Sequence, residues 1–107
     1  MGNHSKHTAG PWRVQTQASH GPCLNVTTER GLFIAAVHEE GFRQETRNES
    51  CANAHLIAAA PDLLDAAQHA LARLELEVRE GRVDPADYAI TMGKLRDAIS
   101  EATGEQE

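Results

Sequence analysis

The stretch ANAHLIAAAPDLLDAAQHALARLELEV, residues 52–78, decides the fold class of this chain. Apolar residues recur there every three or four positions, which is the spacing of one helical face: Leu63, Leu64, Ala67, Leu71, Leu74 and Val78. Pro61 suits the first turn of a helix but disfavours helical geometry at Ala60 before it. We therefore predict a helix at about 51–60 with Ser50 as its N-cap, a bend near Ala60, and a second helix at about 61–80.

The C-terminal region repeats this amphipathic pattern after a turn. Gly81 is placed to end the second helix, and Asp84 precedes Pro85 as a helix N-cap would. The apolar positions that follow share one helical face: Tyr88, Met92, Leu95, Ile99 and Ala102. This pattern predicts a third helix at about 85–103, which forms an αα-hairpin with the second.

The N-terminal half follows a period of two instead. Trp12, Val14 and Thr16 alternate with polar residues, which is typical of a half-buried strand. Two further strands are expected at about 23–28 and 32–38, on either side of a tight turn at Gly31. The third strand is apolar at nearly every position, so we expect it to lie in the centre of the sheet or to be covered on both faces.

Together these elements predict an α+β fold, in which a three-stranded antiparallel β-meander (strands at about 12–17, 23–28 and 32–38) packs against a bent helix and a C-terminal αα-hairpin. A length of 107 residues fits one domain, which we place at 11–104 behind a flexible N-terminal arm at 1–10. Residues 39–50, EEGFRQETRNES, are charged and aperiodic and predict a loop.

The charge and hydropathy of the chain argue against several classes of protein. A formal net charge of -6 is unsuited to nonspecific binding of duplex DNA, which requires a clustered basic surface. No apolar run approaches the roughly 18 to 20 residues that span a bilayer. Residues 1–10 are polar and lack the hydrophobic core of a signal peptide, so we expect a cytoplasmic protein.

Motifs for catalysis, cofactors and metals do not emerge from the sequence. Cys23 and Cys51 are too few and too far apart for a zinc motif, and the six histidines lack the spacing of helical metal ligands. No glycine-rich phosphate loop is present. Cys51, at an expected helix start, is the better candidate for a reactive thiol, although a half-buried packing role suits it more. We expect no enzyme activity, no cofactor and no metal.

The loop at 39–50 is the first of two candidate binding surfaces. It offers an aromatic ring and two guanidinium groups at Phe42, Arg43 and Arg47. One interpretation is a solvated connector. The other is a binding loop for an anionic ligand such as a nucleotide, in which the arginines bind phosphate and Phe42 or Trp12 stacks on the base.

The second candidate surface is the acidic side of the helical hairpin. Glu75, Glu77 and Glu80 either form a solvated face with i,i+4 ion pairs or present a patch to the basic groove of a nucleic-acid-binding protein. Leu76 lies off the apolar stripe of its helix. It therefore indicates a possible contact between two copies in a homodimer.

Two segments resemble a known group of proteins: HTAGPW, residues 7–12, and ANAHLIAAAPDLLDA, residues 52–66. They are similar to short proteins encoded by tailed phages and prophages, which pair a Gly-Pro-Trp strand with an Ala-Asn-Ala helix and an Ala-Pro-Asp/Glu-Leu-Leu segment. The resemblance implies a phage setting, in which small acidic proteins often inhibit host defences. It supplies no catalytic residues for this sequence.

Three functions follow as hypotheses. The leading one is a non-enzymatic counter-defence protein that binds and inhibits a host immune complex, as anti-CRISPR proteins do, through the acidic helical surface or the loop at 39–50. The second is a sponge that sequesters a nucleotide immune messenger. The third is a small structural or regulatory phage subunit whose αα-hairpin completes the helical bundle of a partner.

Overall fold

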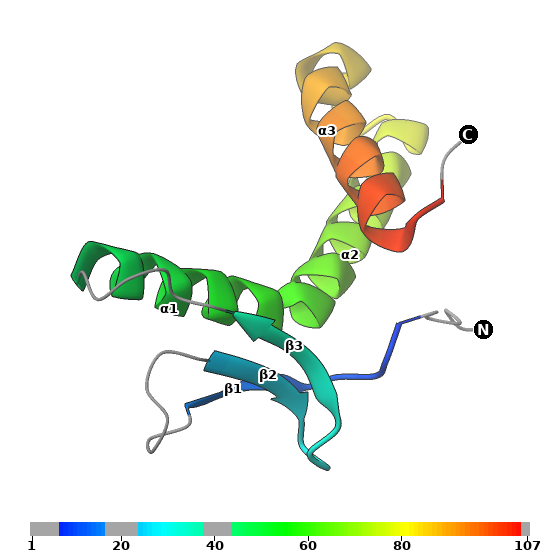
Figure 1. Cartoon of the computed structure of the whole chain (residues 1–107). Coiled ribbons are helices and arrows are strands. Elements are labelled where there is room, and N and C mark those ends of the chain that lie inside the picture. Colours follow the sequence, from blue (N-terminus) through cyan, green and yellow to red (C-terminus); the bar gives the residue numbers. More distant parts are fainter. Residues whose placement is uncertain (1–6, 17–23, 38–43, 106–107) are drawn as a thin grey trace. The chain divides into compact units, whose positions relative to one another are not determined.

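The computed structural model describes residues 7–16, 24–37 and 44–105. It contains three strands, β1 (Trp12–Thr16), β2 (Leu24–Thr28) and β3 (Phe33–Val37), and three helices, α1 (Gln44–Ala58), α2 (Ala60–Arg79) and α3 (Pro85–Thr103), as shown in Figure 1. The α+β class is confirmed. The chain divides into two compact units, one at Thr8–Asp62 and one from Leu63 onwards, which are described separately below. The single domain at 11–104 stays a prediction.

The first unit is an antiparallel sheet of order β1-β2-β3 with α1 packed against one face. Val14 and Ala35 flank Val26 in the ladder, and these side chains point toward α1. Val26 and Ala54 of α1 are both 0% exposed and form the centre of the core. The small side chain of Ala54 therefore allows the helix to approach the sheet closely.

Strand β3 lies at the edge of the sheet, so the expectation that it is central or doubly covered is wrong. The central strand is β2. A bulge in the β2–β3 ladder pairs Val26 with Ala35 but Thr27 with Phe33, which leaves Ile34 as the extra residue. Ile34 packs on the core side, whereas Phe33 is exposed. The uniformly apolar sequence of this strand therefore reflects a bulge rather than burial on both faces.

Helix α1 begins at Gln44, so the predicted loop is wrong over residues 44–50; residues 38–43 lie outside the described part of the chain. The polar residues of this segment have adequate helix propensity but lack the apolar periodicity that would predict a helix. Ser50 is consequently a buried position inside the helix rather than an N-cap. Cys51 is exposed and lies inside the helix rather than at its start, which removes the helix N-terminus as a reason for thiol reactivity.

The break between α1 and α2 falls at Ala59, as the proline predicted. Pro61 has no N–H to continue the hydrogen-bond ladder of α1. It also packs beside the segment that precedes β1, since a Cβ placed on Gly10 would lie 3.3 Å from Cβ of Pro61. The indole Nε1 of Trp12 donates to the carbonyl of Thr8 at 3.2 Å. Residues 8–10 are thus tied to this unit and are not part of a free arm.

The second unit is the αα-hairpin of α2 and α3, whose ends the sequence encodes well. The Oδ1 of Asp84 accepts a hydrogen bond from the N–H of Ala86 at 3.0 Å, which confirms the predicted N-cap of α3. Gly81 and Gly104 adopt φ +74° after α2 and α3. The N–H of Arg82 then reaches the carbonyl of Glu77, and the N–H of Glu105 reaches that of Ser100, so both helices end in a Schellman motif.

Candidate functional site

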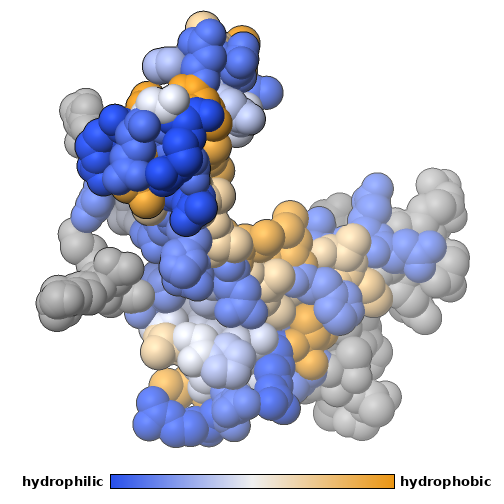
Figure 2. All heavy atoms as spheres, turned by 180° about the vertical axis from the view of Figure 1, so that it is seen from behind, coloured by the Kyte–Doolittle hydropathy of each residue, from blue (hydrophilic) through white to orange (hydrophobic). Residues whose placement is uncertain are grey.

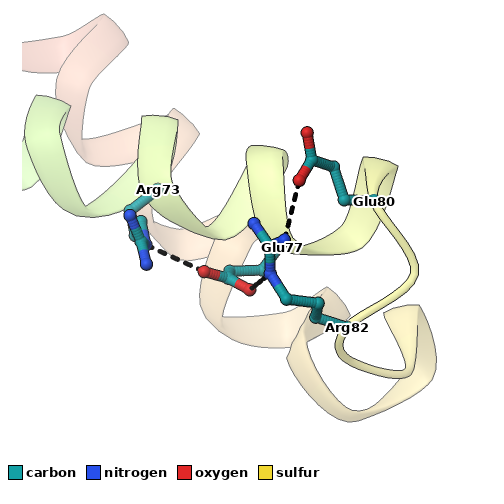
Figure 3. A network of polar contacts seen from close by, with 4 residues as sticks. All are labelled: Arg73, Glu77, Glu80 and Arg82. Atoms are coloured by element: carbon teal, nitrogen blue, oxygen red, sulfur yellow. Dashed lines mark hydrogen bonds and ion pairs between the residues drawn. The ribbon is translucent and has the colours of Figure 1, made fainter.

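Two glutamates, Glu77 in the last turns of α2 and Glu80 just after it, form ion pairs with arginines of the same unit (Figure 3). An oxygen of Glu77 lies 2.6 Å from Nε of Arg82, and its other oxygen lies 2.9 Å from Nε of Arg73. Arg82 also pairs with Glu80 at 2.8 Å. This four-residue network holds the turn after Gly81 against the last turns of α2.

A third glutamate of this surface, Glu75, joins the two helices of the hairpin. The Oε2 of Glu75 lies 3.3 Å from Nη2 of Arg96 on α3. All three glutamates proposed as an acidic patch, Glu75, Glu77 and Glu80, are therefore partnered within the chain. A basic partner would have to compete with these arginines, and the i,i+4 ion-pair interpretation describes Arg73 and Glu77 directly.

The network shifts the acidity of its central carboxylate. The hydrogen bond from Arg82 is the largest cause that lowers the pKa of Glu77 from its ordinary value of 4.5, and the positive charges of Arg82 and Arg73 act in the same direction. The same contacts with Glu77 raise the pKa of Arg82. Glu77 therefore stays ionised at neutral pH and contributes to the structure of the α2 terminus.

The apolar stripe of the hairpin remains only half covered. No residue of α2 is buried, and Met92 is the buried residue of α3. Leu63, at the start of the α2 stripe, is 52% exposed, and the other members of the α2 stripe are half-buried. Ile90 of α3 lies off the stripe and is 76% exposed. Figure 2 shows hydrophobic side chains at the surface of the molecule among hydrophilic ones. Leu76, the residue suggested for self-association, is half-buried. The large apolar side chains that the hairpin exposes most are thus Leu63 and Ile90 rather than Leu76.

The proposed loop site at 39–50 is not assembled by the described residues. Phe42 and Arg43 lie outside the described part of the chain, and Arg47 falls in helix α1. Trp12, the alternative stacking residue, packs against the core of the sheet unit. The nucleotide site made of these four residues stays a prediction.

The sheet has a second face, which is opposite to α1 and carries a group of residues that the sequence did not single out. We call it the outer face, and its residues are Arg13 and Gln15 of β1, Asn25 and Thr27 of β2, and Phe33 and Ala36 of β3. Arg13, Thr27 and Phe33 are direct neighbours in one row across the three strands. The row could not be read from the sequence because the bulge at Ile34 decides that Phe33 points outward.

The centre of this row contains a polar group without a partner. Thr27 is 5% exposed, and its Oγ1 makes no hydrogen bond in the described structure. A buried hydroxyl of this kind is destabilising by about 1–3 kcal/mol when it is left unsatisfied. On one side of it, Arg13 is held by Glu29 through an Nη2–Oε2 contact of 2.7 Å. On the other side, Phe33 is 61% exposed.

Two further kinds of site were tested on the described residues. Within ranges 7–16, 24–37 and 44–105, no three histidine, cysteine or acidic side chains converge as a metal site would require. No helix in the same ranges combines the length and the hydrophobicity that a membrane span needs.

Comparison with protein families connects the chain to phage biology. A family model described as Salmonella phage P22 protein Y8K6 matches residues 1–106. The chain belongs to this family. Comparisons with curated proteins and with solved structures gave no match. Membership of the P22 Y8K6 family supports the phage setting that the Gly-Pro-Trp and Ala-Pro-Asp-Leu-Leu segments implied.

Proposed function

We propose that this member of the P22 Y8K6 family is a non-catalytic phage protein that binds a host immune complex, such as a CRISPR effector, and inhibits it stoichiometrically. The half-covered apolar stripe of the α2–α3 hairpin is the observation that carries the proposal. The phage family supports the setting. The choice of a defence complex as partner follows from that setting.

The hairpin is an under-packed unit that gains from a partner. A two-helix unit with one buried side chain lacks the core that normally stabilises so short a segment. Each square ångström of apolar surface that a partner covers contributes about 25 cal/mol. We therefore expect Leu63 and the half-buried leucines of α2 to form the centre of the contact. The ion-paired glutamates around Glu77 belong to a polar rim, where such pairs contribute little affinity.

Two exposed leucines allow a matched test of this surface. Leu63 is 52% exposed and belongs to the hairpin, whereas Leu56 is 62% exposed and belongs to the sheet unit. The protein is mixed with purified CRISPR effectors of its host, and co-elution and target-DNA binding are measured. We expect the wild-type protein to co-elute with an effector and to reduce its binding of target DNA. Leu63→Glu should weaken both effects, and Leu56→Glu should leave both unchanged. Absence of both effects with the wild-type protein rejects the immune complex as partner.

The same stripe favours a second candidate function. A structural or regulatory phage subunit would use the hairpin to complete a helical bundle with another phage protein. Affinity purification from infected cells separates the two candidates, because this one predicts that phage proteins rather than host proteins co-purify. A dilution-resistant homodimer that Leu63→Glu dissociates would assign the stripe to a second copy instead.

A further inference from the structure

We propose that the row Arg13–Thr27–Phe33 on the outer face of the sheet is a binding slot for a nucleobase, supplied by a nucleotide or by a single strand of nucleic acid. The proposal goes beyond the hairpin function and concerns the other unit of the chain. It uses residues different from the loop residues Phe42, Arg43 and Arg47. Three observations support the proposal independently: the row itself, the unsatisfied hydroxyl at its centre, and the bulge beside the row.

The dimensions of the row suit a flat ring. Neighbouring strands lie about 4.8 Å apart, so the backbones of Arg13 and Phe33 are roughly 10 Å apart across β2. A ring in van der Waals contact with a wall on each side needs roughly 7 Å between those walls. Phe33 is an exposed side chain that can turn to admit the ring, whereas Arg13 is exposed but held by Glu29. A base can therefore stack between a phenyl ring and a guanidinium plane, with Thr27 beneath its edge.

Each residue of the row has a distinct task in such a slot. Aromatic rings and guanidinium planes are the surfaces on which proteins stack unpaired bases. Glu29 holds the guanidinium of Arg13 at 2.7 Å and so limits its orientations. The Oγ1 of Thr27 lacks a partner, and a ring nitrogen or exocyclic group can supply one. Gln15 and Asn25, in the next row, add amide groups that can bind the base edge.

The bulge is the reason that the aromatic ring is available at this position. Without it, regular alternation would place Ile34 opposite Thr27 on the outer face and turn Phe33 toward α1. With it, Phe33 pairs with Thr27 and is 61% exposed, and Ile34 joins the core. Bulges often redirect a side chain next to a functional site. The irregularity thus exposes an aromatic side chain where burial would have been expected.

The test measures binding of the mononucleotides AMP, GMP, CMP and UMP, and of ten-residue adenosine and uridine oligoribonucleotides, by titration calorimetry on the full chain. We expect saturable binding by at least one probe. Phe33→Ala should weaken it about tenfold or more, since that is the usual loss when one stacking side chain is removed. Leu32→Ala is the control, because Leu32 is 51% exposed beside Phe33 but outside the row. The affinity of the Leu32→Ala variant for the same probe should equal that of the wild type.

Thr27→Val supplies a second readout that a purely structural role would not give. It removes a hydroxyl without a partner, so the free protein should keep or gain thermal stability while affinity falls about fivefold. Fluorescence of Trp12, the single tryptophan, verifies that each variant folds. Binding by oligonucleotides alone would identify a single strand as the source of the base. No binding by any probe, or binding that Phe33→Ala and Thr27→Val leave unchanged, overturns the proposal.

Discussion

Because α1 lies close to the sheet, we expect that a larger side chain in place of Ala54 strongly lowers the stability of the protein. Ala54 is 0% exposed and packs against Val26, which is also 0% exposed. Ala54→Leu places an isobutyl group where a methyl fits, so the helix must move away from the sheet. Overpacking of this kind is destabilising by about 2 kcal/mol. For a domain of this size, that loss lowers the melting temperature by roughly 10 °C.

A matched substitution on the same helix isolates this effect. Ala52 is exposed two residues earlier in α1, and leucine there keeps a high helix propensity. We expect Ala52→Leu to change stability by no more than about 0.5 kcal/mol. Thermal melting followed by Trp12 fluorescence reports on this unit, because Trp12 packs against the same core. Equal melting temperatures for the two variants would show that α1 does not depend on a small residue at Ala54.

Two further predictions concern the hairpin. Gly81→Ala should lower the free energy of unfolding by about 1 kcal/mol, because Gly81 has φ +74°. Gly93→Ala should raise it by about 0.5–1 kcal/mol, because Gly93 lies inside α3 and a Cβ there would meet open space. Urea titration followed by circular dichroism measures both values, and a change of the same sign in the two variants would contradict the prediction. The folded-state pKa of Glu77 is lowered, so its stabilising contribution is complete above pH 4.5 and is lost as pH falls through the lower folded pKa. The melting temperature of the wild type should therefore fall more on acidification below pH 4.5 than that of Glu77→Gln, and parallel pH profiles would refute the role of the network.

The features that the sequence predicted well are those encoded by neighbouring residues. Asp84, Pro85 and Gly104 mark the ends of α3 through caps that need no tertiary partner, and the helix was placed correctly. Pro61 likewise set the break between α1 and α2. The start of α1 was missed because its first turns are polar and their helical state depends on the fold around them. The sequence therefore predicts a helix end where neighbouring residues cap it, but not where the surrounding fold extends the helix.

The two candidate sites could not be predicted from neighbouring residues, because they depend on which residues pair across helices and strands. Glu75, Glu77 and Glu80 are conspicuous by charge, yet each is paired with an arginine: Glu77 with Arg73, Glu80 with Arg82, and Glu75 with Arg96 of α3. Phe33 looked like a core residue of a buried strand. Only the bulge at Ile34 brings it beside Thr27 and Arg13. A row across three strands depends on two sets of pairings and cannot be read from one segment.

The segments that carry the family resemblance have a structural task in this chain. Gly10, in the Gly-Pro-Trp segment, lies against Pro61 of the Ala-Pro-Asp-Leu-Leu segment. Ala54, of the Ala-Asn-Ala segment, contacts Val26 in the core. These residues hold α1 and the N-terminal strand together, and none of them belongs to the row on the outer face or to the apolar stripe of the α2–α3 hairpin. Residues that bind a ligand or partner should therefore be sought on those two surfaces, where substitutions leave the core of the sheet unit intact.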